Sequence, residues 1–225
     1  MGILLVKTIS GFVFLLVVMA LALFLLAGSL AFWRAWVYLA VFSVCTILIT
    51  SYLFLYDPEL LARRVKGGPT AETQKGQQII QVTASLFFIG LFVVAGLDFR
   101  FHWSRVPPIL SLIAEGFVGL GFWIVFLVFR ENHYTSAIIE VAREQKVITS
   151  GPYRLVRHPM YSGGGLLIIF TPLALGSWVA IPLAVLLILA IVARLLEEEK
   201  FLLAHLSDYE PYCQKVPHRL LPFLW

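Results

Sequence analysis

The segment Gly151-Pro-Tyr-Arg-Leu-Val-Arg-His-Pro-Met-Tyr161 is a polar, turn-rich stretch between two long apolar runs. Its Gly-Pro start is typical of a turn. Pro159 disfavours helical geometry at His158, so the sequence predicts a break in the chain there. Basic side chains therefore gather where the chain enters an apolar run. Fixed charge beside a membrane is costly unless it binds something, and the segment is a candidate binding site.

The composition is that of a helical membrane protein. The 225 residues are 60% hydrophobic and 13% charged, and the mean hydropathy is +0.90. Soluble domains carry about 25% charged residues. This composition excludes a solvent-exposed nucleic-acid binder. Cys45 and Cys213 lie far apart without metal-ligand spacing, which predicts two reduced, unpaired thiols.

The apolar runs predict an all-α integral membrane fold of about six helices in one polytopic domain, residues 1–225. Residues 1–129 hold four predicted transmembrane helices, in the apolar runs 9–28, 33–56, 79–97 and 109–129. The first run is longer than a usual signal-peptide core, so a retained helix is preferred over a cleaved signal. Asp98 is predicted to end the third helix, in a loop.

Residues 130–225 are predicted to be the cofactor-binding catalytic region. The apolar stretch 163–194 is divided at Gly176-Ser177-Trp178, which predicts a tight helical hairpin with a short first arm. Residues 195–212 continue as an amphipathic tail, and the irregular end beyond them is a candidate cover for a pocket. Gly163 to Gly165 permit either close helix packing or close approach of a cofactor.

The basic residues are distributed unequally between the two sides of the membrane. With a cytoplasmic N-terminus, cytoplasmic segments hold 14 Lys and Arg residues and the opposite segments hold 3, namely Arg34, Arg100 and Arg105. This positive-inside asymmetry predicts a multi-pass protein whose termini and active site face the cytoplasm. The membrane is the inner membrane if the source is bacterial and the endoplasmic reticulum if it is eukaryotic.

The hairpin is expected to bring together two polar clusters that are nearly 40 residues apart. The first is Arg157, His158 and Tyr161, and the second is Glu197 and Glu198. Such a site, backed by apolar helices, suits a small zwitterion with an aromatic part. Glu199 is open to a simpler interpretation, as a solvated residue paired with Lys200. No His, Cys, Asp or Glu set has metal-ligand spacing, so no metal is predicted.

The pattern Gly-Pro-Tyr-x-x-x-Arg-His-Pro-Met-Tyr, followed by Glu197-Glu198, resembles the isoprenylcysteine carboxyl methyltransferase family and, more loosely, phospholipid N-methyltransferases. The resemblance implies S-adenosyl-L-methionine as cofactor and a lipophilic acceptor that enters from the bilayer. It implies catalytic roles for Arg130 and Asn132 near the acceptor. The implied cofactor-binding residues are Lys146, Val147, Gly151, Tyr153, Arg157, His158, Pro159, Tyr161, Glu197 and Glu198.

One departure from the family pattern leaves the acceptor open. The prenylcysteine enzymes carry an Arg within the helix before the motif, suited to a substrate carboxylate. Here residues 119–129 contain none, and the first Arg is Arg130. Either Arg130 substitutes for it and the acceptor is a prenylcysteine-like carboxylate, or the acceptor is an amine, a thiol or another small lipid.

Two other functions remain open from the sequence. Sterol reductases, which use NADPH, end in a similar Arg-His-Pro-x-Tyr segment, but usually with Asn at the place of Met160 and Glu near that of Gly164. A non-enzymatic transporter or assembly factor would place charged or broken-helix features near the bilayer midplane. The polar residues here instead gather at one edge.

Overall fold

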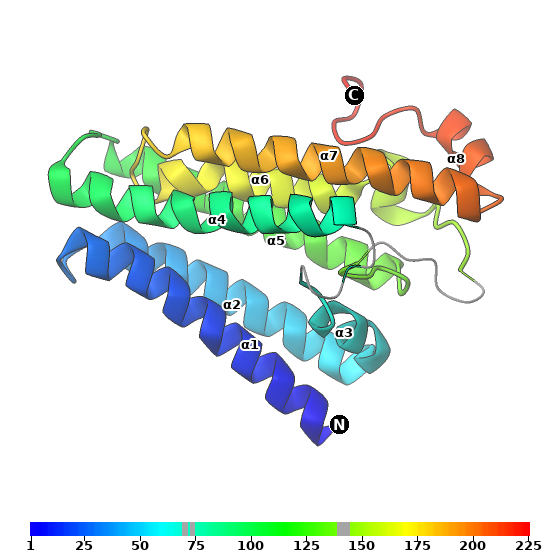
Figure 1. The fold of residues 1–225 in the computed structure, drawn as a ribbon, viewed down its shortest axis with the longest axis horizontal. Helices are drawn as coiled ribbons and strands as arrows, with labels where there is room; N and C mark the ends of the chain where they lie inside the picture. Colours follow the sequence, from blue (N-terminus) through cyan, green and yellow to red (C-terminus); the bar gives the residue numbers. More distant parts are fainter. Residues whose placement is uncertain (69–71, 73–74, 139–144) are drawn as a thin grey trace.

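A computed structural model describes residues 1–68, 72, 75–138 and 145–225, and these form helices without a strand. Figure 1 shows α1 and α2 side by side along one flank of a bundle made by α4 to α7. The prediction of an all-α membrane fold is confirmed. The elements are α1 (Gly2–Ala20), η1 (Leu21–Leu25), α2 (Trp33–Tyr56), α3 (Pro58–Val65), α4 (Lys75–Phe101), α5 (Pro108–Glu131), η3 (Gly151–Arg154), α6 (Pro159–Ala174), α7 (Ile181–His205) and α8 (Tyr209–Lys215).

Within the described residues, four helical segments are long and apolar enough to cross a membrane: Gly2–Leu25, Trp33–Tyr56, Lys75–Phe101 and Pro108–Glu131. They correspond to the four predicted runs: the first begins and ends earlier than predicted, the second has the predicted bounds, and the last two extend beyond theirs at both ends. The helix α6 has 16 residues, or about 24 Å, less than the roughly 30 Å hydrocarbon core. The predicted hairpin with a short first arm is therefore present as α6 and α7.

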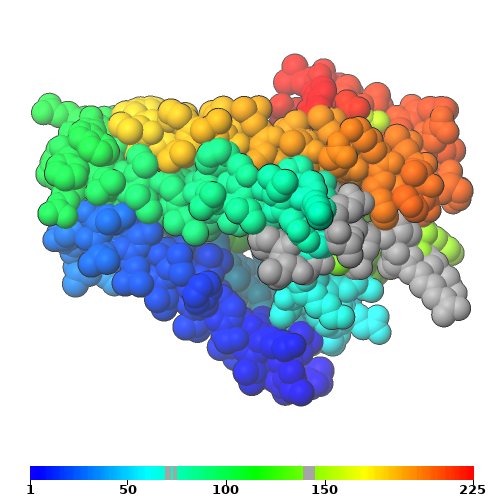
Figure 2. Space-filling view, viewed as in Figure 1, coloured from blue at the N-terminus to red at the C-terminus, as the bar shows by residue number. Residues whose placement is uncertain are grey.

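The N-terminus, α3, η3 and α8 gather at one end of the bundle (Figure 1). The described basic residues that were assigned to the cytoplasm lie in or next to these segments; Arg143, part of the same count, lies outside the described residues. Figure 2 shows the first half of α1 projecting from the rest of the surface at this end. The segments at the other end hold Arg34, Arg100 and Arg105.

The helix α3 lies between the second and third predicted runs, where no helix was predicted. Asp57 is its N-cap, and the side-chain Oδ1 accepts a hydrogen bond from the backbone N–H of Leu60 at 3.0 Å. Pro58 follows at the first helical position, where its missing N–H costs nothing. Leu60 and Leu61 are buried, so one face of α3 packs against the bundle.

The prediction that Asp98 ends a helix and lies in a loop is wrong. Asp98 lies inside α4, is 2% exposed, and accepts hydrogen bonds from the N–H and hydroxyl of Ser104 at 2.7 and 2.6 Å and from the hydroxyl of Ser177. The carboxylate thus joins the α4–α5 loop to the hairpin turn. These hydrogen bonds fix the end of the bundle opposite α3 and α8.

The short arm α6 packs closely on α5 through glycine. A Cβ atom on Gly121 would lie 2.7 Å from the carbonyl oxygen of Gly163, and one on Gly163 would lie 2.9 Å from that of Gly121. Gly164 and Gly165 have open space around the position of a Cβ. Gly163 therefore serves helix packing, one of its two predicted uses, and sets how closely the α6 residues approach α5.

We expect Gly163→Ala to destabilise the protein by about 1–3 kcal/mol, because the added methyl group meets the backbone of α5. Gly165→Ala is the matched control and should be neutral or slightly stabilising, since alanine favours the helix. The apparent melting temperature of both variants in detergent checks this. An equal loss in both would show that the close α5–α6 contact is not what the glycine supplies.

Candidate active site

The motif interrupts the helical structure at the position that the sequence predicted. Gly151 has φ +56°, and a Cβ there would lie 2.8 Å from a carboxylate oxygen of Glu131, so both backbone geometry and space favour glycine. His158 is the N-cap of α6 with non-helical dihedral angles, and Pro159 occupies the first helical position. Arg157 and His158 are thus presented at the N-terminus of α6.

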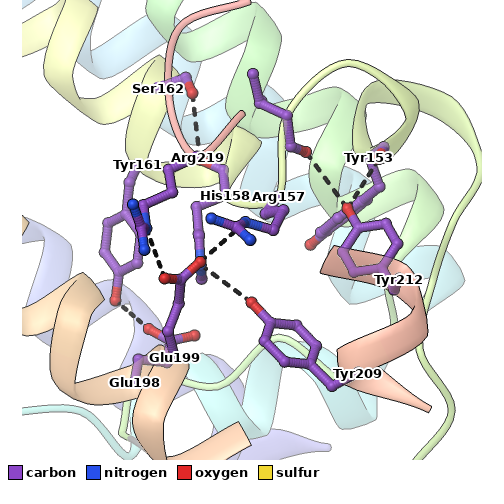
Figure 3. A network of polar contacts seen from close by, with 11 residues as sticks. Tyr153, Arg157, His158, Tyr161, Ser162, Glu198, Glu199, Tyr209, Tyr212 and Arg219 are labelled. Carbon is purple, nitrogen blue, oxygen red and sulfur yellow. Dashed lines mark hydrogen bonds and ion pairs between the residues drawn. The ribbon is translucent and has the colours of Figure 1, made fainter. Parts of the chain in front are cut away.

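Glu199 of α7 is the buried anion on which the motif converges. One carboxylate oxygen, Oε1, lies 3.0 Å from Nε of Arg157 and 3.2 Å from Nε2 of His158, and the other accepts a hydrogen bond from Nε of Arg219 at 2.6 Å. The N–H of Arg157 is not aimed at Oε1, so that contact is an ion pair rather than a hydrogen bond. Figure 3 shows the three basic groups around this carboxylate.

The same contacts explain the protonation state of Glu199. Burial alone would raise the pKa of the carboxyl group. The hydrogen bonds from His158 and Arg219 and the charges of His158 and Arg157 outweigh burial and lower the pKa of Glu199 to about 2. Glu199 is therefore an anion at any physiological pH.

This carboxylate also decides how His158 is oriented. A carboxylate only accepts hydrogen bonds, so Nε2 of His158 carries a hydrogen directed toward Glu199. The hydroxyl of Tyr209 lies 3.2 Å from the same nitrogen and is therefore an acceptor in that contact. The imidazole is held on its Nε2 side by α7 and α8 together.

Glu198, the neighbour of Glu199, reaches a different residue of the motif. The hydroxyl of Tyr161 donates to Oε2 of Glu198 at 2.5 Å (Figure 3). The start of α6 and the C-terminal half of α7 are thereby joined beside the Glu199 cluster. Of the two glutamates predicted to meet the motif, Glu198 does so through Tyr161; Glu199, which was not predicted, contacts Arg157 and His158.

A cavity of about 130 Å³ opens beside these contacts. One part of its wall is polar and includes Arg157, His158 and Glu198. Another part is apolar and is formed by Val147, Leu202 and Leu206. Nine of the residues implied by the family resemblance line the cavity: Asn132, Lys146, Val147, Tyr153, Arg157, His158, Pro159, Tyr161 and Glu198.

Three implied residues do not line the cavity. Arg130 is exposed, with its guanidinium carbon 5.9 Å from the centre of the Phe126 ring. Gly151 packs against Glu131. Glu197 points away and forms an exposed ion pair with Lys200 at 2.6 Å. Lys200 therefore pairs with Glu197, and the alternative interpretation of Glu199 as its solvated partner is wrong.

The C-terminal tail supports the motif through hydrogen bonds. The N–H groups of Arg157 and His158 donate to the carbonyl oxygens of His218 and Arg219 at 2.9 and 3.0 Å, and the Ser162 hydroxyl donates to that of Leu220 at 2.6 Å. None of these tail residues lines the cavity. The irregular end, a candidate pocket cover, supports the wall of the site instead.

Comparison with known families finds a match in this region. Residues 110–208 match the phospholipid methyltransferase family. The resemblance inferred from the motif is thereby confirmed for this segment, since that family is related to the isoprenylcysteine carboxyl methyltransferases. A search of curated proteins finds no match to the chain.

The phospholipid methyltransferase segment begins in α5 and ends just beyond α7, so it contains the motif, the hairpin and both Glu198 and Glu199. The match indicates a membrane methyltransferase. In the part of the chain that the structure describes, no group of three or more His, Cys, Asp or Glu residues is placed to hold a metal ion.

Five residues of this site were not predicted from the sequence. For one of them, Glu199, the spacing of the neighbouring leucines could have predicted its position. Leu195, Glu199, Leu202 and Leu206 share one helical face, and that spacing marks Glu199, not Glu197, as the inward glutamate. The other four are placed by tertiary packing and had no comparable signal: Arg194, Tyr209 and Tyr212, which line the cavity, and Arg219, which binds Glu199.

We expect Glu199→Gln to lower the free energy of unfolding by about 3–5 kcal/mol, because it leaves buried basic groups without their counter-charge. Glu197→Gln removes the same charge from an exposed ion pair and should cost under about 1 kcal/mol. Melting curves of the two variants in the same detergent test this. Similar stabilities would mean that the Glu199 cluster contributes little to the fold.

The low pKa of Glu199 predicts how acid affects stability. A carboxyl with an ordinary pKa of 4.5 and a folded-state pKa of about 2 stabilises the fold fully above pH 4.5, and this contribution is lost as pH falls toward 2. The wild-type protein should therefore lose more stability than Glu199→Gln over that window. Parallel acid-induced melting shifts in the two proteins would contradict the assignment.

Proposed function

We propose that the protein is an integral-membrane methyltransferase that uses S-adenosyl-L-methionine and acts on a lipophilic acceptor reached from the bilayer. Acceptors of this class include a prenylcysteine-like carboxylate and related small lipids or thiols. The observation that carries the proposal is one cavity with a cationic and an anionic side chain at one wall and an apolar surface at another, inside a phospholipid methyltransferase segment. Methyltransferases of this family generally use this cofactor.

The side chains around the cavity fit the groups of that cofactor. Among the described residues, no group accepts a hydrogen bond from the terminal nitrogens of Arg157. These nitrogens suit the carboxylate of the cofactor. Glu198 uses Oε2 for Tyr161, and its Oε1 suits the ammonium group or the ribose hydroxyls. Val147, Leu202 and Leu206 offer an apolar surface for the adenine ring. Lys146, Tyr153, His158 and Pro159 complete the proposed cofactor site.

S-adenosyl-L-methionine, when bound, supplies the methyl group. Transfer of a methyl group to a nucleophile needs in-line alignment and a dry site more than it needs a proton relay. The residues of this chain are suited to alignment: Glu199 fixes Arg157 and His158, and the Tyr161–Glu198 hydrogen bond fixes α6 against α7. The adjoining apolar helices exclude water and give a lipophilic acceptor access from the side.

Asn132 is proposed to position the site rather than to react. Its Nδ2 donates to the hydroxyl of Tyr153 at 2.8 Å, and its Oδ1 accepts from the N–H of Tyr134 at 2.9 Å. Both ends of the side-chain amide are therefore used to hold the cavity wall. Arg130 is left out of the proposed site because its side chain is exposed away from the cavity.

The proposed orientation places the cavity and both ends of the chain in the cytoplasm. The support is the unequal distribution of basic residues, which gather in the segments at the cavity end of the bundle. A soluble cofactor would then enter from the cytoplasm and the acceptor from the inner leaflet.

We expect the detergent-purified protein to bind S-adenosyl-L-methionine, and Glu198→Gln to weaken binding by about 10- to 100-fold, because a charged hydrogen-bond partner is lost. Glu197→Gln is the matched control on the next residue and should bind like wild type. Equilibrium binding of labelled cofactor tests this. Absence of binding to the folded wild-type protein, or equal affinity in both variants, would refute the proposal.

A further inference from the structure

Arg64, in the last turn of α3, lies beside the cavity and forms no ion pair with any acidic residue that the structure describes. Its Nη1 donates to the carbonyl oxygen of Ser136 at 2.7 Å, and its guanidinium carbon lies 5.3 Å from the centre of the Phe129 ring. No carboxylate of the described residues lies within 4.0 Å of it, and no described residue accepts a hydrogen bond from its Nε or Nη2. These two nitrogens are the groups through which we propose below that Arg64 binds a ligand.

The neighbouring charges do not neutralise Arg64. Ser136, its hydrogen-bond partner, lines the cavity, as do Tyr161 and Glu198, which act on it electrostatically. Glu198 is bonded to Tyr161, and the nearby Arg194 is already paired with Glu72 at 2.8 Å. Burial lowers the pKa of the Arg64 guanidinium. Tyr161 and Glu198 act against burial, while the charge of Arg194 adds to it. An arginine in this position remains charged, so an anion beside it would be stabilised.

The surroundings of Arg64 are otherwise apolar. Leu60 and Leu61, one turn earlier on α3, are buried in an apolar cluster, and the partly buried side chains of Val65 and Met160 pack against it. Met160 also lines the cavity. A fixed cation with a hydrocarbon-like surface next to it matches an amphiphile with an anionic group and an apolar chain. A soluble anion would gain nothing from that surface.

We propose that Arg64 binds the anionic oxygen group of an amphiphilic methyl acceptor, a carboxylate or a phosphate, at the wall of the cofactor cavity. This inference rests on the proposed function and narrows its acceptor to an anionic lipid. Arg64 lies outside the phospholipid methyltransferase segment, in the N-terminal half of the chain. It would supply from α3 the cation that Arg130, exposed on α5, does not bring to the cavity.

The test compares binding of three labelled single-chain probes that share an oleoyl chain: oleate, 1-oleoyl lysophosphatidate and uncharged 1-oleoylglycerol. The proteins are wild type, Arg64→Gln, which removes the charge but keeps a donor for the Ser136 carbonyl, and Arg63→Gln. Arg63 is the matched control, because it lies on the same helix with the same charge and donates to the His133 carbonyl at 2.6 Å.

We expect wild type and Arg63→Gln to bind at least one anionic probe about tenfold or more tightly than the uncharged probe, and Arg64→Gln to lose that preference. A preference for oleate alone identifies a carboxylate acceptor, and one for lysophosphatidate alone a phosphate. A wild type that binds all three probes equally, or an Arg64→Gln variant that keeps the preference, overturns the inference. Even if Arg64→Gln fails to fold, a wild type without anion preference overturns the inference.

Cofactor binding, measured on the same samples, separates this inference from the proposed function. Loss of the anion preference in Arg64→Gln with unchanged S-adenosyl-L-methionine affinity assigns Arg64 to the acceptor side. If wild type binds the anionic probe but not the cofactor, the proposed function fails while the anion site stands. If it binds the cofactor without any anion preference, the proposed function stands and the Arg64 site fails.

Discussion

A buried carboxylate surrounded by three basic groups is the interaction on which the site depends. Glu199 is 6% exposed and contacts Arg157 and His158 of the motif and Arg219 of the tail. Taking such charges out of water is costly, and only mutual compensation keeps them there. The arrangement therefore persists only when α7, the motif and the tail are all in place. That requirement gives the cavity one defined polar wall.

The rest of the bundle serves to bring these partners to one end. The Gly121–Gly163 contact sets α6 close to α5, and the hairpin returns α7 alongside α6. At the far end, Asp98 holds the hairpin turn to the α4–α5 loop. The polar groups with catalytic potential are consequently concentrated at the end that also carries α3 and α8, where water and lipid are both within reach.

Much of this organisation could be predicted from the sequence, because membrane helices leave strong signals. The apolar runs, the hairpin break at Gly176 and the turn at Gly151-Pro152 follow from hydropathy and local backbone chemistry. The meeting of Tyr161 with Glu198 followed from the hairpin alone. These features depend on residues near each other in sequence or on a single chain reversal.

The remaining features depend on how a helix is rotated about its own axis or on tertiary contacts. Three consecutive glutamates, 197 to 199, point to different sides of α7, and only the register of the flanking leucines distinguishes them. The helix α3 had a cap signal at Asp57-Pro58 that the polar composition obscured. Arg219 contacts Glu199, and Arg64 lies near Tyr161 and Glu198, from segments that no local pattern connects with the motif, so their positions required the fold.

The most direct test of the account is an experimental structure of the protein with S-adenosylhomocysteine, the demethylated product of the cofactor. The account predicts density for that molecule between Arg157 and Glu198, at the end of the bundle that carries α3 and α8. Density at the opposite end, near Asp98, or a ligand that contacts neither Arg157 nor Glu198, would contradict it.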